Sequence, residues 1–315
     1  MKISLVIPVK NEAKNIERLL RSISRQTRIP DEVVLVNAGS MDRTEDIIRG
    51  YNDKRLAIRT VSLQGAYPGT ARNVGVTSAA YDCIAFTDAG IELNDTWLEA
   101  LTATMEKDPS IDVVYGNYTP RTDTFFKRCL AMAFVAPLRK VPGGSMRTRF
   151  IASSLMRRNV WREVGGFPDF RAAEDRIFME KIDMKNFKVS RNQNAGLLWD
   201  IPENAGRTFR RFFSYSYHDL RAGKARDWHI PVLRMYCAGV VLAVLGFFVS
   251  PVFLFLLGAG LFFRIARRIS SHRDERYFSL PLVGLYLFGT GFVILLIDAA
   301  LFLGWGKYLS RGGKS

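Results

Sequence analysis

The chain has 315 residues, which is enough for one large domain or two smaller ones. It carries 45 lysine and arginine residues against 30 acidic residues, a formal net charge of +15, and its 48% of apolar residues are unevenly distributed. The three cysteines, Cys83, Cys129 and Cys237, lie in apolar contexts without paired spacing, which argues against a zinc site and fits a reducing compartment.

The first sixty residues alternate between strand and helix patterns. Residues 3–9 are largely apolar, as in a strand of a buried parallel sheet, and Asn11 can cap the helix that follows. The next residue, Glu12, is either a first-turn acid favoured by the helix dipole or a ligand. Residues 32–36 predict a second strand and residues 56–61 a weaker third one. This alternation predicts an α/β fold with a parallel, doubly wound sheet.

A loop containing Gly and Pro, residues 65–69, opens the next predicted helix. The N-terminus of a helix is a natural site for phosphate, so Arg72 and Asn73 in the first turns are candidates to reach a nucleotide. The alternative is a loop and helix with a solvated arginine.

Asp88 follows a short apolar strand predicted at residues 83–86. Ligands of open α/β sheets bind at the carboxyl ends of strands. A carboxylate there, with Glu92 four residues on and Gly90 between them, suits a hard divalent cation and, through it, a diphosphate. The alternative is a polar exit from the strand, since Asp and Gly are common turn residues.

The middle of the chain is strongly basic. Residues 121–162 contain ten basic side chains against the single acid Asp123. Within this stretch, residues 124–140 resemble an interfacial amphipathic segment, and residues 142–145 predict a flexible loop that serves as a substrate lid or entrance. Such charge beside membrane segments favours anionic headgroups or a phosphate-bearing substrate as the partner, and argues against nucleic acid.

Further strands are predicted at residues 112–115 and 150–156, and a last edge strand at residues 188–190. Before that last strand, Glu174 and Asp175 head a predicted helix. Either they act as helix caps, or one carboxylate faces a cleft and takes a proton from an acceptor hydroxyl.

Two uncharged stretches, residues 235–263 and 277–297, are long enough to cross the roughly 30 Å of hydrocarbon in a bilayer. We expect about two transmembrane helices, the first either kinked or folded into a re-entrant hairpin at Pro251. A hairpin returns the Arg-rich loop 264–276 to the cytoplasm, as positive loops prefer, whereas two plain crossings do not. The N-terminus lacks a signal-peptide pattern, so we expect an integral membrane protein with residues 1–230 on the cytoplasmic side.

These patterns predict four segments along the chain. They are a catalytic domain at residues 1–206, a basic aromatic interfacial segment at 207–234, a membrane region at 235–306 and a tail at 307–315. The interfacial segment begins with Arg207, Arg210 and Arg211 and interleaves basic with aromatic side chains.

Five motifs together resemble family 2 glycosyltransferases with the GT-A fold, a nucleotide-binding α/β domain, over roughly residues 3–230. They are Ile7-Pro8-Val9-Lys10-Asn11-Glu12, Val36 to Asp42, Gly69 to Gly75, Thr87-Asp88-Ala89-Gly90, and Gly165-Gly166-Phe167 followed by Glu174-Asp175. Their order and spacing are typical of the family. With the membrane region attached, the chain is similar to polyprenyl-phosphate and lipid-linked glycosyltransferases.

The resemblance implies a role for each motif. The residues implied to bind the nucleotide are Pro8, Val9, Asn11, Glu12, Asn37, Arg72, Asn73, Asp88 and Ala89. Asp88, helped by Glu92, would bind Mg²⁺ or Mn²⁺ and so neutralise the departing diphosphate. Asp175, next to Glu174, would be the general base of an inverting single displacement. The arginines implied to hold acceptor phosphate are Arg207, Arg210 and Arg211.

Three departures from the family pattern bear on these roles. Gly90 replaces the second Asp of the metal motif, Asn37-Ala38 replaces the usual Asp-Asp, and the Gln-x-x-Arg-Trp of processive synthases is not matched. The last departure implies transfer of a single sugar.

We therefore predict a membrane-anchored enzyme that moves a sugar from a nucleotide-diphosphate donor to a lipid-linked acceptor at the cytoplasmic face. The acceptor is either a hydroxyl of a lipid-linked saccharide or polyprenyl phosphate. The alternative is a catalytically degenerate GT-A domain that serves as a membrane scaffold.

Overall fold

The computed structural model describes residues 1–312, which form two compact units. The first unit comprises Met1–Arg121 and Arg139–Asp200, and the second comprises Thr122–Leu138 and the residues from Ile201 onward. The chain therefore leaves the first unit after Arg121 and re-enters it at Arg139. By compactness the units divide at Asp200, six residues before the predicted end of the catalytic domain, whose functional boundaries remain a prediction.

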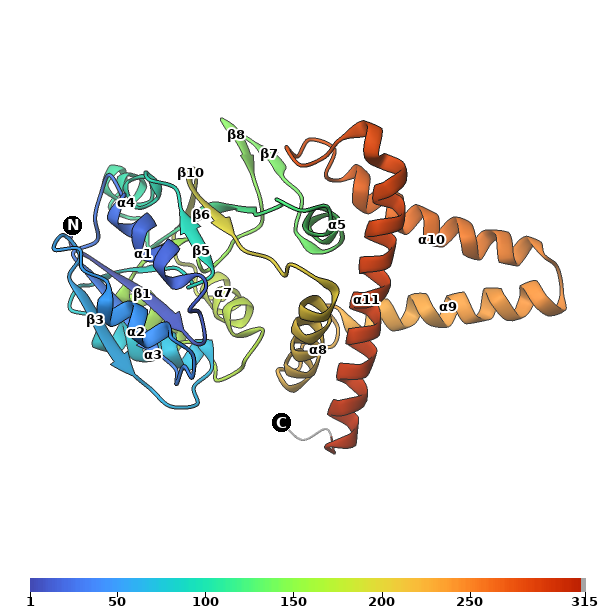
Figure 1. Ribbon diagram of the computed structural model, residues 1–315, viewed down its shortest axis with the longest axis horizontal. Helices are drawn as coiled ribbons and strands as arrows, with labels where there is room; N and C mark the ends of the chain where they lie inside the picture. Colours follow the sequence, from blue (N-terminus) through green and yellow to red (C-terminus); the bar gives the residue numbers. More distant parts are fainter. Residues whose placement is uncertain (313–315) are drawn as a thin grey trace. The chain divides into compact units, whose positions relative to one another are not determined.

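A mixed sheet forms the centre of the first unit, with strand order β3-β2-β1-β4-β9-β6-β10-β5 (Figure 1). Its strands are β1 (Ile3–Val9), β2 (Glu32–Asn37), β3 (Ile58–Ser62), β4 (Cys83–Phe86), β5 (Ile91–Leu93), β6 (Val113–Pro120), β9 (Ser154–Arg157) and β10 (Val189–Trp199). The first four strands in this order are mutually parallel, β9 is antiparallel to β4 and β6, and β5 is antiparallel to β10. The predicted α/β class with a GT-A-like sheet is confirmed.

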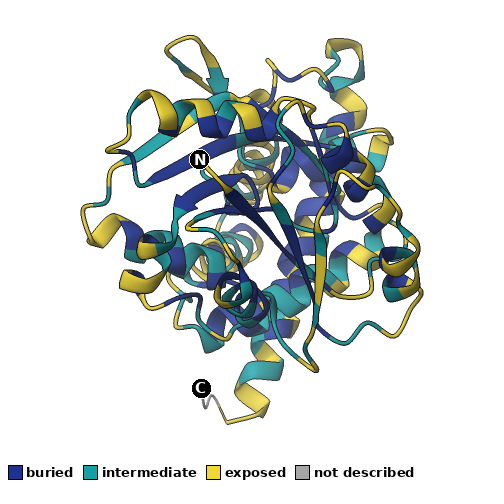
Figure 2. Cartoon of the chain, turned by 90° about the vertical axis from the view of Figure 1, so that its left-hand side faces the viewer, coloured by how far each residue is buried: buried dark blue, intermediate teal, exposed yellow. Residues whose placement is uncertain are grey.

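Helices pack on this sheet by their apolar faces. They are α1 (Ile16–Ser24), α2 (Thr44–Gly50), α3 (Pro68–Ser78), α4 (Trp97–Lys107), α6 (Arg158–Val164) and α7 (Glu174–Met184). In α1, for example, Ile16, Leu19, Leu20 and Ile23 recur at helical spacing and are fully buried. Figure 2 shows the resulting pattern, in which the central strands are buried and the outer helix faces are exposed.

Gly75 is required where α3 approaches the sheet. A Cβ at this position would lie 2.3 Å from Val6 Cγ1 of β1, closer than side chains can pack. The glycine therefore brings α3, with Arg72 and Asn73, close to the central strands.

Several predicted elements of the first unit were wrong in extent. The strand expected at residues 150–156 begins only at Ser154 and runs antiparallel to its neighbours. The edge strand expected at residues 188–190 is the eleven-residue β10, which pairs with both β6 and β5 and is therefore internal. Of the loop expected at residues 142–145, only residues 142–143 form a turn, and the other two belong to β8 (Gly144–Met146), which pairs with β7 (Arg139–Val141) in a hairpin. The sequence of β10 contains many polar residues and no long apolar run, so its pattern does not predict a strand of this length. Its extended conformation depends on pairing with neighbouring strands on both sides.

The second unit is helical. It contains α5 (Phe125–Phe134), α8 (Ala205–Arg221), α9 (His229–Phe248), α10 (Val252–Ser270), the 3-10 turn η1 (Leu280–Leu282) and α11 (Val283–Ser310). The segments His229–Phe248 and Leu280–Ser310 are long and apolar enough to cross a membrane. The predicted tail at 307–315 starts inside α11, and residues 313–315 lie outside the described residues.

The first uncharged stretch is not one kinked helix. Helix α9 ends at Phe248, α10 begins at Val252, and the two pack side by side as a hairpin around Ser250-Pro251 (Figure 1). Gly246 permits this packing, since a Cβ there would lie 2.5 Å from Leu254 Cγ. The stretch thus folds as a helical hairpin, and its course in a membrane stays a prediction.

A buried polar network joins the hairpin to α11. Both carboxylate oxygens of Asp298 accept hydrogen bonds from the guanidinium of Arg264 in α10, at 2.6 and 3.0 Å. The Tyr236 hydroxyl in α9 donates to the same carboxylate at 2.9 Å. Because Asp298 is only 2% exposed, its charge depends on these partners.

Candidate active site

The carboxyl ends of β2, β1 and β4 lie next to one another in the first unit. The pairing register places Asn37 beside Val9, and Phe86 beside Val6. Because these strands are parallel, the segments that follow them leave the sheet at one edge. The residues predicted to bind the nucleotide therefore share this edge or the helix beside it. Those in or directly after the three strands are Pro8, Val9, Asn11, Glu12, Asn37, Asp88 and Ala89.

The turns after β1 and β2 are joined by hydrogen bonds. Asn11, at a φ of 54°, donates its backbone N–H to Ser40 Oγ at 3.0 Å and accepts from Met41 N at 2.8 Å. The backbone N–H of Glu12 donates to Thr44 Oγ1 at 2.8 Å. Asn37 is buried, and its side-chain amide bonds Ser40 and Glu45. Both asparagines therefore shape these turns, but Asn37 is buried whereas Asn11 is exposed at the surface.

Arg72 is the centre of the charged cluster at this edge. Its guanidinium donates to Asp88 Oδ1 at 2.7 Å and to Glu174 Oε1 at 3.0 Å, and its side chain is 4% exposed. Burial alone would lower the pKa of Arg72, but the charges of Asp88 and Glu174 raise it above its usual value. The guanidinium also lies over the ring of Phe167, 5.5 Å from its centroid. Arg72 therefore connects the end of β4 with the first turn of α7.

The two acids at the start of α7 have different surroundings. Glu174 is buried against Arg72, whereas Asp175 is half-buried and accepts a hydrogen bond from Arg176 N at 2.7 Å. Ala173, the residue before them, has a left-handed φ of 67°, an unfavourable conformation for a residue with a Cβ. Burial, and then the charge of Asp175, raises the pKa of Glu174 to about 7, although Arg72 opposes the shift.

The raised pKa of Glu174 predicts a pH-dependent stability. The pKa of Glu174 is about 7 in the folded protein, against an ordinary value of 4.5. As the pH rises, the unfolded chain therefore loses this proton before the folded protein does. The free energy of unfolding consequently falls as the pH rises between these two values. Relative to Glu174→Gln, the wild-type protein should lose about 3 kcal/mol of unfolding free energy between pH 4.5 and 7.5. Unfolding of both proteins in detergent across this range measures the difference. If the difference in unfolding free energy between the two proteins does not change with pH, the raised pKa of Glu174 is wrong.

Asn73 holds a loop in place. Its side-chain oxygen accepts from Trp161 Nε1 and from Phe167 N, both at 2.8 Å, and its amide donates to Phe167 O at 2.8 Å. Gly166, at a φ of 70°, passes so close that a Cβ there would lie 2.8 Å from Asn73 Oδ1. These bonds use the side-chain oxygen and one of the two amide hydrogens, so Asn73 positions Phe167 in the structure, and its contact with the nucleotide stays a prediction.

Phe167 was not singled out as a site residue by the sequence. Its ring stacks on that of Phe178, with 3.9 Å between the centroids, and packs edge-on against Phe86, with 5.5 Å between the centroids. These contacts hold in place the ring on which the Arg72 guanidinium lies. Its position directly after two glycines with left-handed backbones was the available signal. Thr87 was also passed over, although its buried hydroxyl has no hydrogen-bond partner among the described residues.

Asp88 and Glu92 have separate partners. Glu92 lies in β5, and its carboxylate accepts from Arg121 at 2.5 Å and contacts Arg25 and Arg18 at 3.4 and 3.9 Å. Within residues 1–312, no three His, Cys, Asp or Glu side chains form a group that could hold a metal ion by themselves. A magnesium ion bound with phosphate oxygens needs only one or two carboxylates, so the chemistry of Asp88 fits such an ion. Glu92, engaged by arginines, fits the role less well.

The arginines predicted to hold phosphate lie on α8 of the second unit. Arg207 pairs with Glu203 at 2.7 Å and Arg210 is exposed. Arg211 is half-buried. They thus form part of a basic face near the start of α8.

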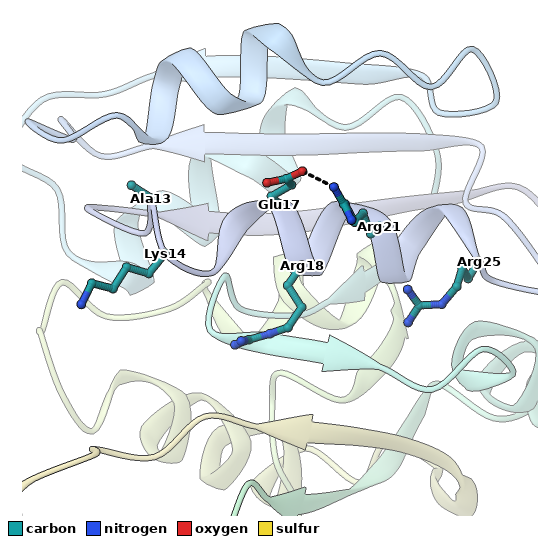
Figure 3. A pocket seen from close by; sticks show the side chains of 6 residues that line it. All are labelled: Ala13, Lys14, Glu17, Arg18, Arg21 and Arg25. Atoms are coloured by element: carbon teal, nitrogen blue, oxygen red, sulfur yellow. Dashed lines mark hydrogen bonds and ion pairs between the residues drawn. The ribbon is translucent and has the colours of Figure 1, made fainter. Parts of the chain in front are cut away.

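A shallow hollow along α1 is also basic but is less suited to an anion (Figure 3). It is lined by Ala13, Lys14, Glu17, Arg18, Arg21 and Arg25. Arg21 pairs with Glu17 at 2.6 Å, Arg18 with Asp200 at 2.8 Å, and Arg25 with Asp95 at 3.3 Å. The Arg72 cluster is the better candidate, because it includes Asp88 at the carboxyl end of β4, where ligands of such sheets bind.

Known proteins share this fold. The solved structure of the mannosyltransferase PcManGT from Pyrobaculum calidifontis, in complex with GDP-Man and Mn²⁺, aligns with a TM-score of 0.58. The alignment covers 99% of this chain and 88% of that one at 20% identity, which shows likeness of fold alone.

Sequence comparison gives the family. Glycosyltransferase AglE of Haloferax volcanii is 34% identical over 121 residues, 36% of this chain and 38% of that protein, so the chain spans little more than a third of that relative. O-antigen chain rhamnosyltransferase RfbN of Salmonella typhimurium is 26% identical over 224 residues, 68% of this chain and 71% of that protein. The model of glycosyl transferase family 2 matches residues 4–165, just over half of the 315 residues. The chain therefore belongs to glycosyl transferase family 2.

Proposed function

We propose that this protein is an inverting glycosyltransferase that moves a sugar from a nucleotide-diphosphate donor to a lipid-linked acceptor. The observation that carries the proposal is the contact chain Asp88–Arg72–Glu174. It connects the carboxyl end of β4, where donors bind in folds of this type, with the helix start that bears Asp175. The PcManGT complex with GDP-Man and Mn²⁺ supports a nucleotide-sugar donor.

On the donor side, Asp88 would hold Mg²⁺ or Mn²⁺ jointly with the diphosphate. The bound cation would supply charge neutralisation for the leaving diphosphate. Arg72 would then add a fixed positive charge beside the same phosphates. Asn11 and Glu12, which follow β1 at this edge, would border the nucleoside.

On the acceptor side, Asp175 would serve as the general base. It would take the proton of an acceptor hydroxyl as that oxygen forms a bond to the anomeric carbon. The bond from that carbon to the diphosphate oxygen breaks on the opposite face, so the configuration inverts. Glu174 would act through Arg72 as a positioning residue.

The membrane side of the proposal rests on the second unit. Its helices α9 and α11 are apolar over membrane-compatible lengths, and α8 carries Arg207, Arg210 and Arg211. We propose that these arginines hold the phosphate of a lipid-linked acceptor and that the catalytic unit faces the cytoplasm, because basic segments stay on that side.

The experiment that tests this function is a donor screen on detergent-purified protein. UDP-, GDP- and CMP-sugars are incubated with and without Mn²⁺, and both hydrolysis and thermal protection are measured. One donor should be turned over or should stabilise the protein in a metal-dependent way, and Asp88→Ala should lose both effects.

Asp46→Ala is the matched control, since it removes an exposed carboxylate from α2 of the same unit. This variant should behave as the wild type. Silence of the folded wild-type protein across the whole panel would refute the enzyme assignment and favour a degenerate scaffold, with Gly90 as the physical reason.

A further inference from the structure

The hairpin of α9 and α10 is apolar on all sides. No charged side chain occurs from residue 235 to residue 263. Phe247, Phe248 and Phe255 near its tip are 81%, 77% and 74% exposed. A hairpin that docks on another protein would keep a polar face toward water, whereas a helix that is apolar all round belongs in a core or in lipid. The occupant of this surface is therefore a lipid bilayer.

Although α9 as a whole has the length of a membrane span, the uncharged part of each arm is too short to cross a bilayer. Residues 235–248 of α9 and residues 252–263 of α10 number 14 and 12. At 1.5 Å per residue these arms are about 21 Å and 18 Å long, against about 30 Å of hydrocarbon. The arms end at Arg234 on one side of the turn and at Arg264 on the other. Both ends of the hairpin therefore return to the same headgroup layer.

Helix α11 is flanked along its length by helices that carry charge. Near its start, Gly289 packs on α5, where a Cβ would lie 2.5 Å from Cys129 Sγ. Near its end, Leu301 O accepts a hydrogen bond from Ser216 Oγ of α8 at 2.7 Å. Helix α8 also bears Arg210 and Arg211, and α5 bears basic residues too. Such charged neighbours cannot enter hydrocarbon with α11.

The outer face of α11 is a narrow apolar stripe. The first four of its exposed large residues are spaced by three or four positions, and the last two follow after steps of eight and six, which still places all of them on one side of the helix. They are Leu285, Phe288, Phe292, Leu295, Leu303 and Leu309. One buried face and one exposed apolar stripe suit a helix lying in the membrane interface, not one surrounded by lipid.

We propose that the chain is monotopic. The hairpin enters the bilayer and returns to the same side, α11 lies in the interface of that leaflet, and no helix among the described residues crosses. Basic residues next to the hairpin base, Arg267 and Arg268, favour a leaflet with anionic headgroups. The proposal is independent of the transfer reaction.

Cysteine accessibility in sealed proteoliposomes containing anionic lipid tests this topology. The full chain carries Cys83→Ser, Cys129→Ala and Cys237→Ala, and single cysteines are placed at Met41, Ser250, Asp274 or Ser310. Vesicles are first captured through an N-terminal affinity tag that is accessible from outside, so that each variant has one orientation. A membrane-impermeant maleimide added outside should then label the Met41→Cys, Asp274→Cys and Ser310→Cys variants to the same extent. The Ser250→Cys variant at the hairpin tip should react only after detergent is added.

Three outcomes would overturn the proposal. Reaction of Ser250→Cys with reagent enclosed inside the vesicles means that the hairpin crosses. Protection of Ser310→Cys where Met41→Cys is labelled means that α11 crosses. Failure of the protein to float with the vesicles means that the bilayer is not the occupant. If the substituted background does not fold, protease protection of terminal epitope tags on the wild-type chain gives the same distinction between one side and two.

Discussion

Asp175→Asn is expected to slow sugar transfer by about 10²- to 10⁴-fold, the contribution of a positioned general base. The amide keeps the shape of the side chain and the oxygen that accepts from Arg176 N at 2.7 Å, so the start of α7 should be preserved. It cannot take the proton of an acceptor hydroxyl. Transfer of labelled sugar to membrane lipid extract, with the donor found by the screen, measures the rate, and the loss should appear in kcat.

The matched control is Asp183→Asn, which makes the same change further along α7. Asp183 forms a partly exposed pair with Arg149 at 2.6 Å, and such pairs contribute little to stability. This variant should transfer sugar at the wild-type rate. Near-normal transfer by Asp175→Asn would refute the base assignment and identify a phosphate acceptor, whose oxygen is already ionised and needs no base.

Asp298→Ala should lower the free energy of unfolding of the second unit by about 3–5 kcal/mol. The substitution leaves the guanidinium of Arg264 without its bidentate partner and removes the acceptor of the Tyr236 hydroxyl. Breaking a buried pair from one side costs more than the pair contributes, because the remaining charge is left unpaired. Thermal unfolding in detergent, followed by near-ultraviolet circular dichroism, measures the loss.

A double variant tests whether the unpaired charge of Arg264 causes the loss. Arg264→Met with Asp298→Leu removes both charges and refills the space with apolar atoms, so it should recover most of the stability. If Asp298→Ala melts at the wild-type temperature, the network does not hold the hairpin base. If the double variant is no better than Asp298→Ala, the unpaired charge is not the cause, and the polar contacts of Asp298 themselves provide the stability.

The parts of the fold that depend on short apolar runs could be predicted from the sequence. The strands around Leu5, Val34 and Ala85 lie in continuous apolar segments, so their location and burial followed from local pattern. Asp88 was expected at the carboxyl end of its strand for the same reason, and the structure has it there. Pro251 likewise indicated where the first long uncharged stretch turns.

The contacts of the candidate site could not be predicted, because they join residues far apart in sequence. Arg72 and Glu174 are separated by 102 positions, and no local pattern shows that the guanidinium also reaches Asp88. The resemblance pointed to Asp175 as the base, but no local pattern separates it from Glu174, and only packing makes Glu174 buried and leaves Asp175 half-buried. Local sequence also could not show that three arginines from distant segments contact Glu92, the second predicted metal ligand.

The excursion of residues 122–138 into the second unit limits how the protein can be truncated. A fragment that stops at Asp200 keeps α5 but discards α10 and α11, the helices on which α5 packs. Cys129, Leu130 and Met132, all buried in the intact chain, would then face solvent. Such a fragment would expose a new hydrophobic patch and would therefore aggregate. A water-soluble catalytic unit requires two changes, removal of the C-terminal helices and a bypass of α5.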